Sequence, residues 1–210
     1  MQITDAIFYI AILIMSVVIH EVSHGFMAEY FGDKTARNMG RLTMNPLKHL
    51  DMFGSILLPA LLILTKAPFL FGWAKPVPYN PNNLSDRKWG TVWVASAGIL
   101  ANLFIAVFFG ILIRVMPSFG LSIETLVSLL KVLSIIVIMN LALAIFNLVP
   151  IPPLDGSKIL FSFLPSSLYY VVSFMERYSL IFLFVFIAFF SDSLYPILVF
   201  LYHLVTGLMF

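Results

Sequence analysis

The sequence places two histidines and a glutamate in the pattern His-Glu-x-x-His, at His20, Glu21 and His24. On a helix, residues four positions apart share one face, so both imidazoles can reach one metal ion. Glu21 follows the first imidazole directly, where its carboxylate can act on a metal-bound water. With four histidines in 210 residues, the chance expectation for this pattern is on the order of 10⁻³. A zinc site is the favoured interpretation, and a proton relay or a buried polar network in a helix bundle is the alternative.

The motif supplies two ligands, whereas catalytic zinc usually has three protein ligands and a water in an open position. The chain has no cysteine, which excludes both disulfides and thiolate ligands. The remaining histidines, and the carboxylates near apolar surroundings, are His49, His203, Glu29, Glu124, Asp155 and Glu176. Asp155 is the strongest candidate, because it follows three prolines at the end of a long apolar stretch. Its alternative role is the N-cap of a helix that starts near Gly156.

The composition indicates that these groups lie in a membrane protein. Hydrophobic residues make up 61% of the chain and charged residues 10%, and the mean hydropathy is +1.02. An ordinary soluble domain carries roughly 25% charged residues, so a water-soluble globule of this size cannot hide so much apolar surface. The expected environment is the lipid bilayer, and intrinsic disorder, a secreted disulfide scaffold and nucleic-acid binding are excluded.

Apolar stretches predict an all-α polytopic membrane protein with about five transmembrane helices. They lie at residues 6–31, 89–113, 124–149, 169–190 and 194–210. Short β-strands are expected near the active site, around 35–44 and 73–79. Pro76 and Pro78 restrict the second of these to an edge, where a substrate strand can pair only in part.

The segment 52–71 begins with an apolar stretch, Met52–Thr65, that is too short to cross comfortably, because about 14 helical residues span only ~21 Å of a ~30 Å hydrocarbon core. Eight of the twelve basic residues in the chain lie between positions 33 and 90, within and around this segment: Lys34, Arg37, Arg41, Lys48, Lys66, Lys75, Arg87 and Lys88. A crossing would divide them between the two sides of the membrane, whereas a re-entrant or interfacial element keeps them together on the cytoplasmic side.

The same topology bears on the third ligand. If 52–71 does not cross the membrane, the span 89–113 crosses it in one direction and the span 124–149 crosses it back. Asp155 then lies on the same side of the membrane as His20 and His24. If it crosses, Asp155 arrives on the opposite side. The re-entrant interpretation therefore accounts for the clustered basic residues and for a three-ligand site together.

These features resemble the site-2 protease family of intramembrane zinc metalloproteases. The resemblance rests on His20–His24 and on Asn147–Gly156 (NLVPIPPLDG), which is similar to the family's NxxPxPxxDG motif. The runs 45–51, 72–78 and 97–102 look like the compact prokaryotic branch. No gap between the predicted helices can hold the PDZ domain that many relatives carry. The resemblance covers residues 10–160 and implies one protease domain over 1–210, with a catalytic core at about 6–160 and further membrane helices at about 165–210.

The resemblance also implies roles for individual residues. His20, His24 and Asp155 would bind one zinc ion per chain, and Glu21 would be the general base. Asn147 would assist at the substrate carbonyl, its alternative being a helix-packing hydrogen bond of about 0.6 kcal/mol. The implied activity is endoproteolysis within or near the transmembrane segments of single-pass membrane proteins. The implied location is the cell membrane, with the active site facing the cytoplasm.

Two other functions stay open from the sequence. Membrane-embedded histidines also suit a metal or ion transporter, although no inverted repeat is evident. A catalytically inactive scaffold is disfavoured by the complete residue set. The sequence does not indicate the oligomeric state. The roles of His49, Asn102 and Asn140 also stay open, since each can be a packing group or can line the site.

Overall fold

The computed structural model describes residues 3–65 and 72–209, and within these ranges the chain forms helices and no strand. The α-helices are α1 (Ile3–Tyr30), α2 (Thr35–Asn38), α3 (Leu58–Leu64), α4 (Arg87–Val115), α5 (Ile123–Leu148), α6 (Asp155–Phe161), α7 (Tyr169–Arg177), α8 (Ser179–Phe190) and α9 (Tyr195–Thr206). Shorter helical turns are η1 (Pro46–Lys48), η2 (Met52–Leu57), η3 (Pro81–Asn83), η4 (Met116–Phe119), η5 (Ser166–Leu168) and η6 (Ser191–Leu194).

The predicted all-α polytopic fold is confirmed. Four helical stretches of the described chain are long and apolar enough to cross a membrane, namely Ile7–Tyr30, Arg87–Phe119, Ile123–Leu148 and Ser179–Thr206. The sequence predicted two spans at the C-terminal end, at 169–190 and 194–210, and the structure has one. The charged pair Glu176 and Arg177 falls at the end of α7, which has only nine residues. The apolar helices α8 and α9 then join through η6 into a single stretch.

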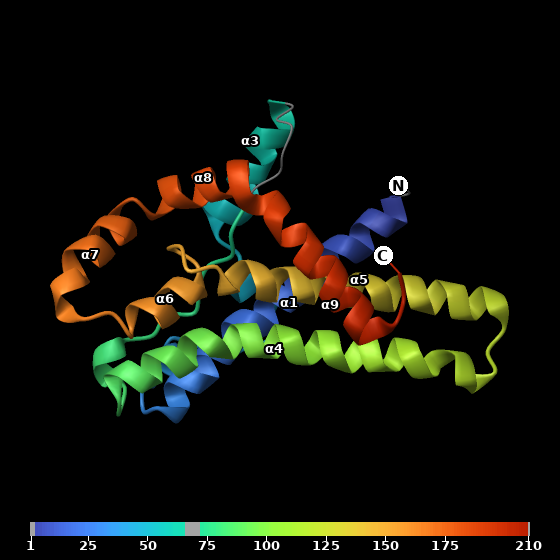
Figure 1. Ribbon diagram of the computed structural model, residues 1–210, viewed down its shortest axis with the longest axis horizontal. Helices are drawn as coiled ribbons and strands as arrows, with labels where there is room; N and C mark the ends of the chain where they lie inside the picture. The colour runs from blue at the N-terminus through green and yellow to red at the C-terminus, as the bar shows by residue number, and fades with distance from the viewer. Residues whose placement is uncertain (1–2, 66–71, 210) are drawn as a thin grey trace.

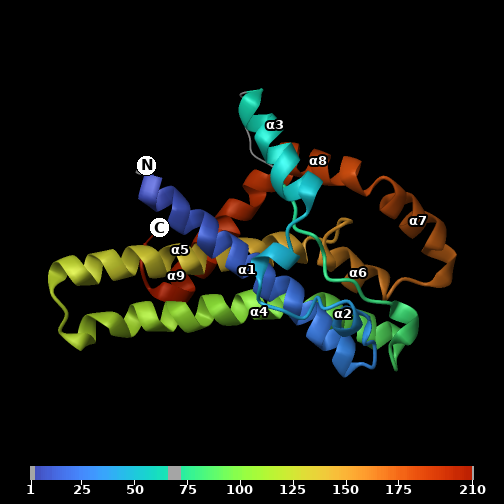
Figure 2. The same ribbon diagram turned by 180° about the vertical axis from the view of Figure 1, so that it is seen from behind.

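Helices α4 and α5 form an antiparallel pair, and α1 crosses both of them (Figures 1 and 2). Capping side chains start the pair: Asp86 accepts a hydrogen bond from the Trp89 N–H, and Ser122 from the Thr125 N–H. Helix α9 packs on both members of the pair. Gly110 allows close approach there, because a Cβ at this position would lie 2.0 Å from Cγ1 of Val205. Small residues at such contacts are typical of membrane helices.

The segment η2–α3 projects away from the α4–α5 pair (Figures 1 and 2). The Trp73 N–H donates to the Gly54 carbonyl at 3.2 Å, and the Ser55 hydroxyl donates to the Trp73 carbonyl at 2.7 Å. The outgoing and returning chains therefore lie side by side, which is the arrangement that a re-entrant element requires. Residues 66–71, the last part of the predicted element, lie outside the described residues.

The two predicted β-strands are wrong: neither 35–44 nor 73–79 forms one. The first range begins with the single turn of α2, and the second lies in an irregular connection at residues 72–80. Pro76 and Pro78 have no N–H to donate to a strand ladder. Side-chain contacts replace the ladder, since Arg41 Nη2 donates to the carbonyls of Lys75 and Pro76 at 2.9 and 3.2 Å.

Candidate metal centre

Helix α1 presents the two histidines of the His-Glu-x-x-His motif on one face. They are one turn apart, and their ring centroids lie 4.6 Å from each other. Both side chains are buried, His20 with 5% and His24 with 7% of its surface exposed. Ionisable groups buried at this depth in a membrane helix are costly, and they are usually retained for function.

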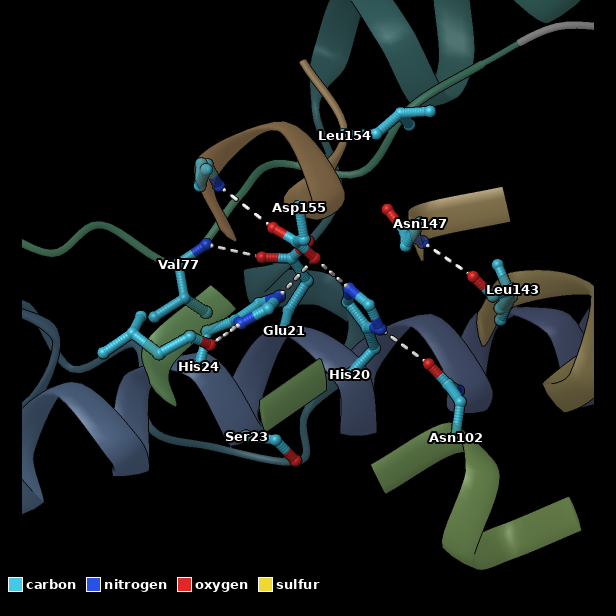
Figure 3. A network of polar contacts seen from close by, with 12 residues as sticks. His20, Glu21, Ser23, His24, Val77, Asn102, Leu143, Asn147, Leu154 and Asp155 are labelled. Atoms are coloured by element: carbon cyan, nitrogen blue, oxygen red, sulfur yellow. Dashed lines mark hydrogen bonds and ion pairs between the residues drawn. The ribbon is translucent and has the colours of Figure 1, made fainter. Parts of the chain in front are cut away.

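Asp155, the first residue of α6, meets both histidines although it lies 135 residues from His20 in sequence (Figure 3). Its Oδ2 atom lies 3.1 Å from Nε2 of His20 and 3.0 Å from Nε2 of His24. Ligand atoms of the three buried side chains all lie within 4.8 Å of one another. The sequence predicts that His20, His24 and Asp155 lie on the same side of the membrane, and the structure brings them into contact.

Hydrogen bonds at the far side of each ring fix which nitrogen faces Asp155. Nδ1 of His24 lies 2.6 Å from the Val94 carbonyl, which can only accept. The Nδ1–H therefore donates, which in the neutral imidazole leaves the lone pair on Nε2. Nδ1 of His20 lies 2.6 Å from Oδ1 of Asn102 in the same manner. Metal-bound histidines characteristically have such an outer partner, so the donor set of two neutral imidazoles and one carboxylate fits zinc.

The orientation of Asn102 is itself determined by a buried network. Its Nδ2 group donates to Oδ1 of Asn140 at 2.8 Å and to the Ser16 carbonyl at 3.3 Å. Asn140 in turn donates to the Ser16 hydroxyl at 3.0 Å. Both asparagines have no exposed surface. The network joins α1, α4 and α5 behind His20, so the two asparagines whose roles the sequence left open support the candidate ligand from outside.

Glycines allow the helices to approach these side chains. A Cβ on Gly98 of α4 would lie 2.6 Å from both Cε1 of His20 and Nε2 of His24. A Cβ on Gly156 would lie 2.2 Å from the Leu148 carbonyl oxygen. The first glycine makes room for the two imidazole rings, and the second lets α6 begin against the end of α5, where Asp155 reaches the histidines.

A cavity of about 130 Å³ adjoins this cluster. Its lining residues are Glu21, His24, Pro76, Val77, Tyr79, Asn147, Pro153, Asp155 and Lys158. Oε2 of Glu21 accepts a hydrogen bond from the Val77 N–H at 2.8 Å (Figure 3). One carboxylate oxygen of Glu21 is thus held by the backbone of the 72–80 connection, while the side chain borders the cavity.

Asn147 lies near the end of α5 and lines the same cavity as Glu21. Its Nδ2 group donates one hydrogen bond, to the Leu143 carbonyl of its own helix at 3.0 Å (Figure 3). An amide nitrogen carries two hydrogens, so a second donor is available for another acceptor.

The 72–80 connection is held in place by residues of the segment that follows α2. Besides the two Arg41 contacts, its Lys75 N–H donates to the His49 carbonyl at 2.8 Å. His49 is 2% exposed, and its Nε2 lies 2.9 Å from the Thr43 carbonyl. His49 is therefore a structural residue of this connection and is not part of the three-residue cluster.

Asp33 binds the C-terminal end of the 72–80 connection. It is fully buried and accepts hydrogen bonds from the Asn80 N–H at 2.6 Å and from Nδ2 of Asn83 at 2.9 Å. It also accepts from the hydroxyl and N–H of Thr35. Burial alone would raise the pKa of Asp33, but the hydrogen bonds from Thr35, Asn83 and Asn80 outweigh it and lower the pKa.

Lys158 also belongs to this site, although it was not among the residues predicted from the sequence. Its Nζ atom lies 3.0 Å from Oδ1 of Asp155. Burial opposes the charge on Lys158, yet the pKa of Lys158 is raised, mainly by Asp155. The spacing of three residues from Asp155 on a predicted helix was the available clue. Tyr79 and Val77 were likewise missed, because long-range folding alone brings them here.

A family model described as "Peptidase family M50" matches residues 8–130 and 123–190 of the chain, and no PDZ domain is found. The Bacillus subtilis protein named "Putative zinc metalloprotease YwhC" is 39% identical over 171 residues, which cover 80% of this chain and 74% of that protein. The Mycolicibacterium smegmatis protein named "Putative zinc metalloprotease Rip2" is 30% identical over 150 residues, 71% of this chain and 54% of that protein. No solved structure is significantly similar to the chain.

Proposed function

The chain belongs to peptidase family M50, the site-2 protease family, and from this premise we propose that it is an intramembrane endopeptidase formed by one domain over residues 1–210. The chain is a multi-pass membrane protein and a zinc metalloprotease, of a family that acts on membrane proteins. The transporter alternative is set aside on the same grounds. The catalytic core is assigned to residues 6–160, with the C-terminal helices as an addition.

The proposed zinc ligands are His20, His24 and Asp155. The observation that carries this assignment is the convergence of three buried donor atoms within 4.8 Å from helices that are far apart in sequence. Val94 and Asn102 support it, because their hydrogen bonds to Nδ1 leave Nε2 of each neutral imidazole free to bind a metal ion beside Asp155. A zinc ion bound there would supply Lewis acidity for water and for the scissile carbonyl.

Glu21 is the proposed general base. It follows His20 on α1 and borders the cavity, so its carboxylate can take a proton from the attacking water and return it to the leaving amine. The Val77 N–H holds Oε2, which orients the carboxylate and leaves Oε1 as the proton acceptor.

Asn147 is proposed to bind the substrate carbonyl oxygen. Its second amide hydrogen is available, since Leu143 takes only one. A donor that contacts the developing oxyanion contributes about 3–4 kcal/mol to the transition state. The alternative, a helix-packing bond, corresponds to the observed contact with Leu143 and would contribute only to stability.

The substrates are proposed to be single-pass membrane proteins. An apolar groove of about 450 Å³ lies between α1, α5 and the η6–α9 region. Its lining includes Leu143, which lies one turn before Asn147 on α5, so the groove and the catalytic cavity are both lined by this helix. A single apolar segment fits this surface better than a polar chain. Part of the segment must be unwound before its peptide bonds can reach Glu21.

The chain is proposed to lie in the cell membrane with its active site facing the cytoplasm. The support is the set of eight basic residues between positions 33 and 90, which the positive-inside rule places on that side.

The chain has no cysteine, so single cysteines introduced at the exposed positions Lys48, Ser85 and Ser118 can be labelled individually. An impermeant reagent should reach Lys48→Cys and Ser85→Cys from the cytoplasmic side and Ser118→Cys from the other. Labelling of the first two from opposite sides would contradict the topology.

Zinc content tests the ligand assignment. Purified wild-type protein should hold about one zinc per chain, and Asp155→Ala and His24→Ala should lose it. The matched control is His203→Ala, because His203 is exposed and lies on α9. Equal zinc in all four proteins would refute the assignment.

A further inference from the structure

The two carboxylate oxygens of Asp155 have different partners. Oδ2 faces the two imidazoles, at 3.1 and 3.0 Å, whereas Oδ1 contacts the ammonium group of Lys158 at 3.0 Å. The Asp155 side chain is 7% exposed and that of Lys158 is 42% exposed. One oxygen of the buried carboxylate, Oδ2, therefore faces the proposed metal position, and the other, Oδ1, forms an ion pair with Lys158.

This division matters because a carboxylate can bind a metal through one oxygen or through both. Catalytic zinc has three protein ligands and keeps the next position open for water or substrate. A second oxygen from Asp155 would compete for that position. We propose that Lys158 is a positioning residue that restricts Asp155 to one-oxygen ligation and so keeps the open position free. This inference rests on the proposed assignment of His20, His24 and Asp155 as the zinc ligands.

The backbone around Asp155 makes the restriction effective. Gly156 packs so closely on α5 that a Cβ would lie 2.2 Å from the Leu148 carbonyl oxygen, and the Ser157 hydroxyl donates to the Leu154 carbonyl at 2.7 Å. The start of α6 therefore cannot shift easily. Rotation of the carboxylate is the remaining freedom, and the contact with Lys158 Nζ removes it.

Lys158 is also the one lysine or arginine among the described residues that line the catalytic cavity. The other acidic side chain on this cavity, Glu21, takes its hydrogen bond from the Val77 N–H. Among the described lining residues, no other cation is therefore present to replace Lys158 at Oδ1 of Asp155.

A second ion pair provides a matched control. Arg37 pairs with Glu29 through two hydrogen bonds, but its side chain is 58% exposed and the pair lies on the surface. Exposed ion pairs contribute little to stability. Removing its cation tests the loss of a salt bridge without any effect on Asp155.

The experiment is zinc K-edge X-ray absorption on the zinc-loaded full chain in detergent, with kcat and KM measured for a membrane substrate. Wild type, Lys158→Arg and Arg37→Met should each show about four zinc ligands. Lys158→Met should show about five, because Asp155 then binds through both oxygens. Its kcat should fall by about 10–100-fold, with KM changed by less than about twofold. If Lys158→Met does not fold, Lys158→Ala takes its place.

Four ligands and an unchanged kcat in a folded Lys158→Met or Lys158→Ala protein would overturn the inference. Failure of the underlying assignment looks different: wild-type spectra would then lack two imidazoles, or Asp155→Ala would keep its zinc. The two failures are therefore distinguished within the same set of samples.

Discussion

Nδ1 of His20 and Oδ1 of Asn102 lie 2.6 Å apart, and this contact determines which nitrogen of the ring faces Asp155. Asn102 is held with its oxygen toward His20, because its nitrogen is bound by Asn140 and Ser16. Three transmembrane helices thus contribute to the tautomer of one imidazole. The candidate metal centre is consequently supported by residues that lie outside the three-residue cluster.

Replacing Asn102 with leucine should weaken zinc binding. The substitution keeps the approximate size of the side chain but removes the acceptor for the His20 Nδ1–H, and such outer partners typically contribute 10–100-fold in metal affinity. Competition with a zinc chelator measures the change. Asn82→Leu is the control, since Asn82 is exposed in η3, and its zinc affinity should match wild type. Equal affinities in both variants would contradict the proposed support of His20.

Alanine substitutions at two glycines of α4, Gly98 and Gly110, distinguish an effect on the metal site from an effect on helix packing. Gly98→Ala should displace both imidazoles, because the new Cβ would lie 2.6 Å from ring atoms of His20 and His24. Gly110→Ala meets Val205 of α9 at 2.0 Å instead. Both variants should melt at lower temperatures than wild type, yet only Gly98→Ala should lose bound zinc. Zinc retention in Gly98→Ala would show that the rings can move aside without cost to the site.

The motif residues could be predicted because their spacing alone brings them together. His20 and His24 share a helix face whatever the rest of the chain does, and the family motif identifies Asp155. The structure shows all three in contact, while their role as zinc ligands stays a prediction. The helical, multi-span character of the fold followed similarly from the apolar stretches, although about five spans were predicted and the described chain has four.

The outer parts of the site could not be predicted in the same way. Asn102 and Asn140 form contacts between helices, and a single sequence does not show which helix faces which. The 72–80 connection was expected to be a strand, but its prolines lack the N–H groups that a ladder needs, and Arg41 and His49 bind it instead. Lys158 was overlooked because a lysine on a helix is usually a solvated residue.

Asp33 gives the protein a predicted dependence on pH. Because the pKa of Asp33 is lower in the folded protein than its ordinary value of about 3.9, its contribution to the free energy of unfolding is present above that value. The contribution is lost as the pH falls through the folded pKa. The melting temperatures of wild type and Asp33→Asn should therefore differ near neutral pH and converge on acidification. A difference that stays constant down to about pH 2 would contradict this role.

Access of an apolar substrate segment can be tested at Ala142, which lines the groove on α5 and is only partly exposed. Ala142→Trp should fill part of the groove. It should lower kcat/KM for a single-span membrane substrate by about tenfold or more, corresponding to about 1.4 kcal/mol. Cleavage of a short soluble peptide should change little, because such a peptide does not need the groove. Equal losses for both substrates would indicate a disturbed active site instead.

The most direct test of intramembrane proteolysis by Glu21 is mass spectrometry of a single-span substrate after incubation with purified protein. Wild type should release two fragments whose new ends lie within or near the span. Glu21→Gln, which keeps the shape of the side chain but removes the base, should bind zinc normally and release no fragments. Full cleavage by the zinc-loaded Glu21→Gln protein would contradict the account.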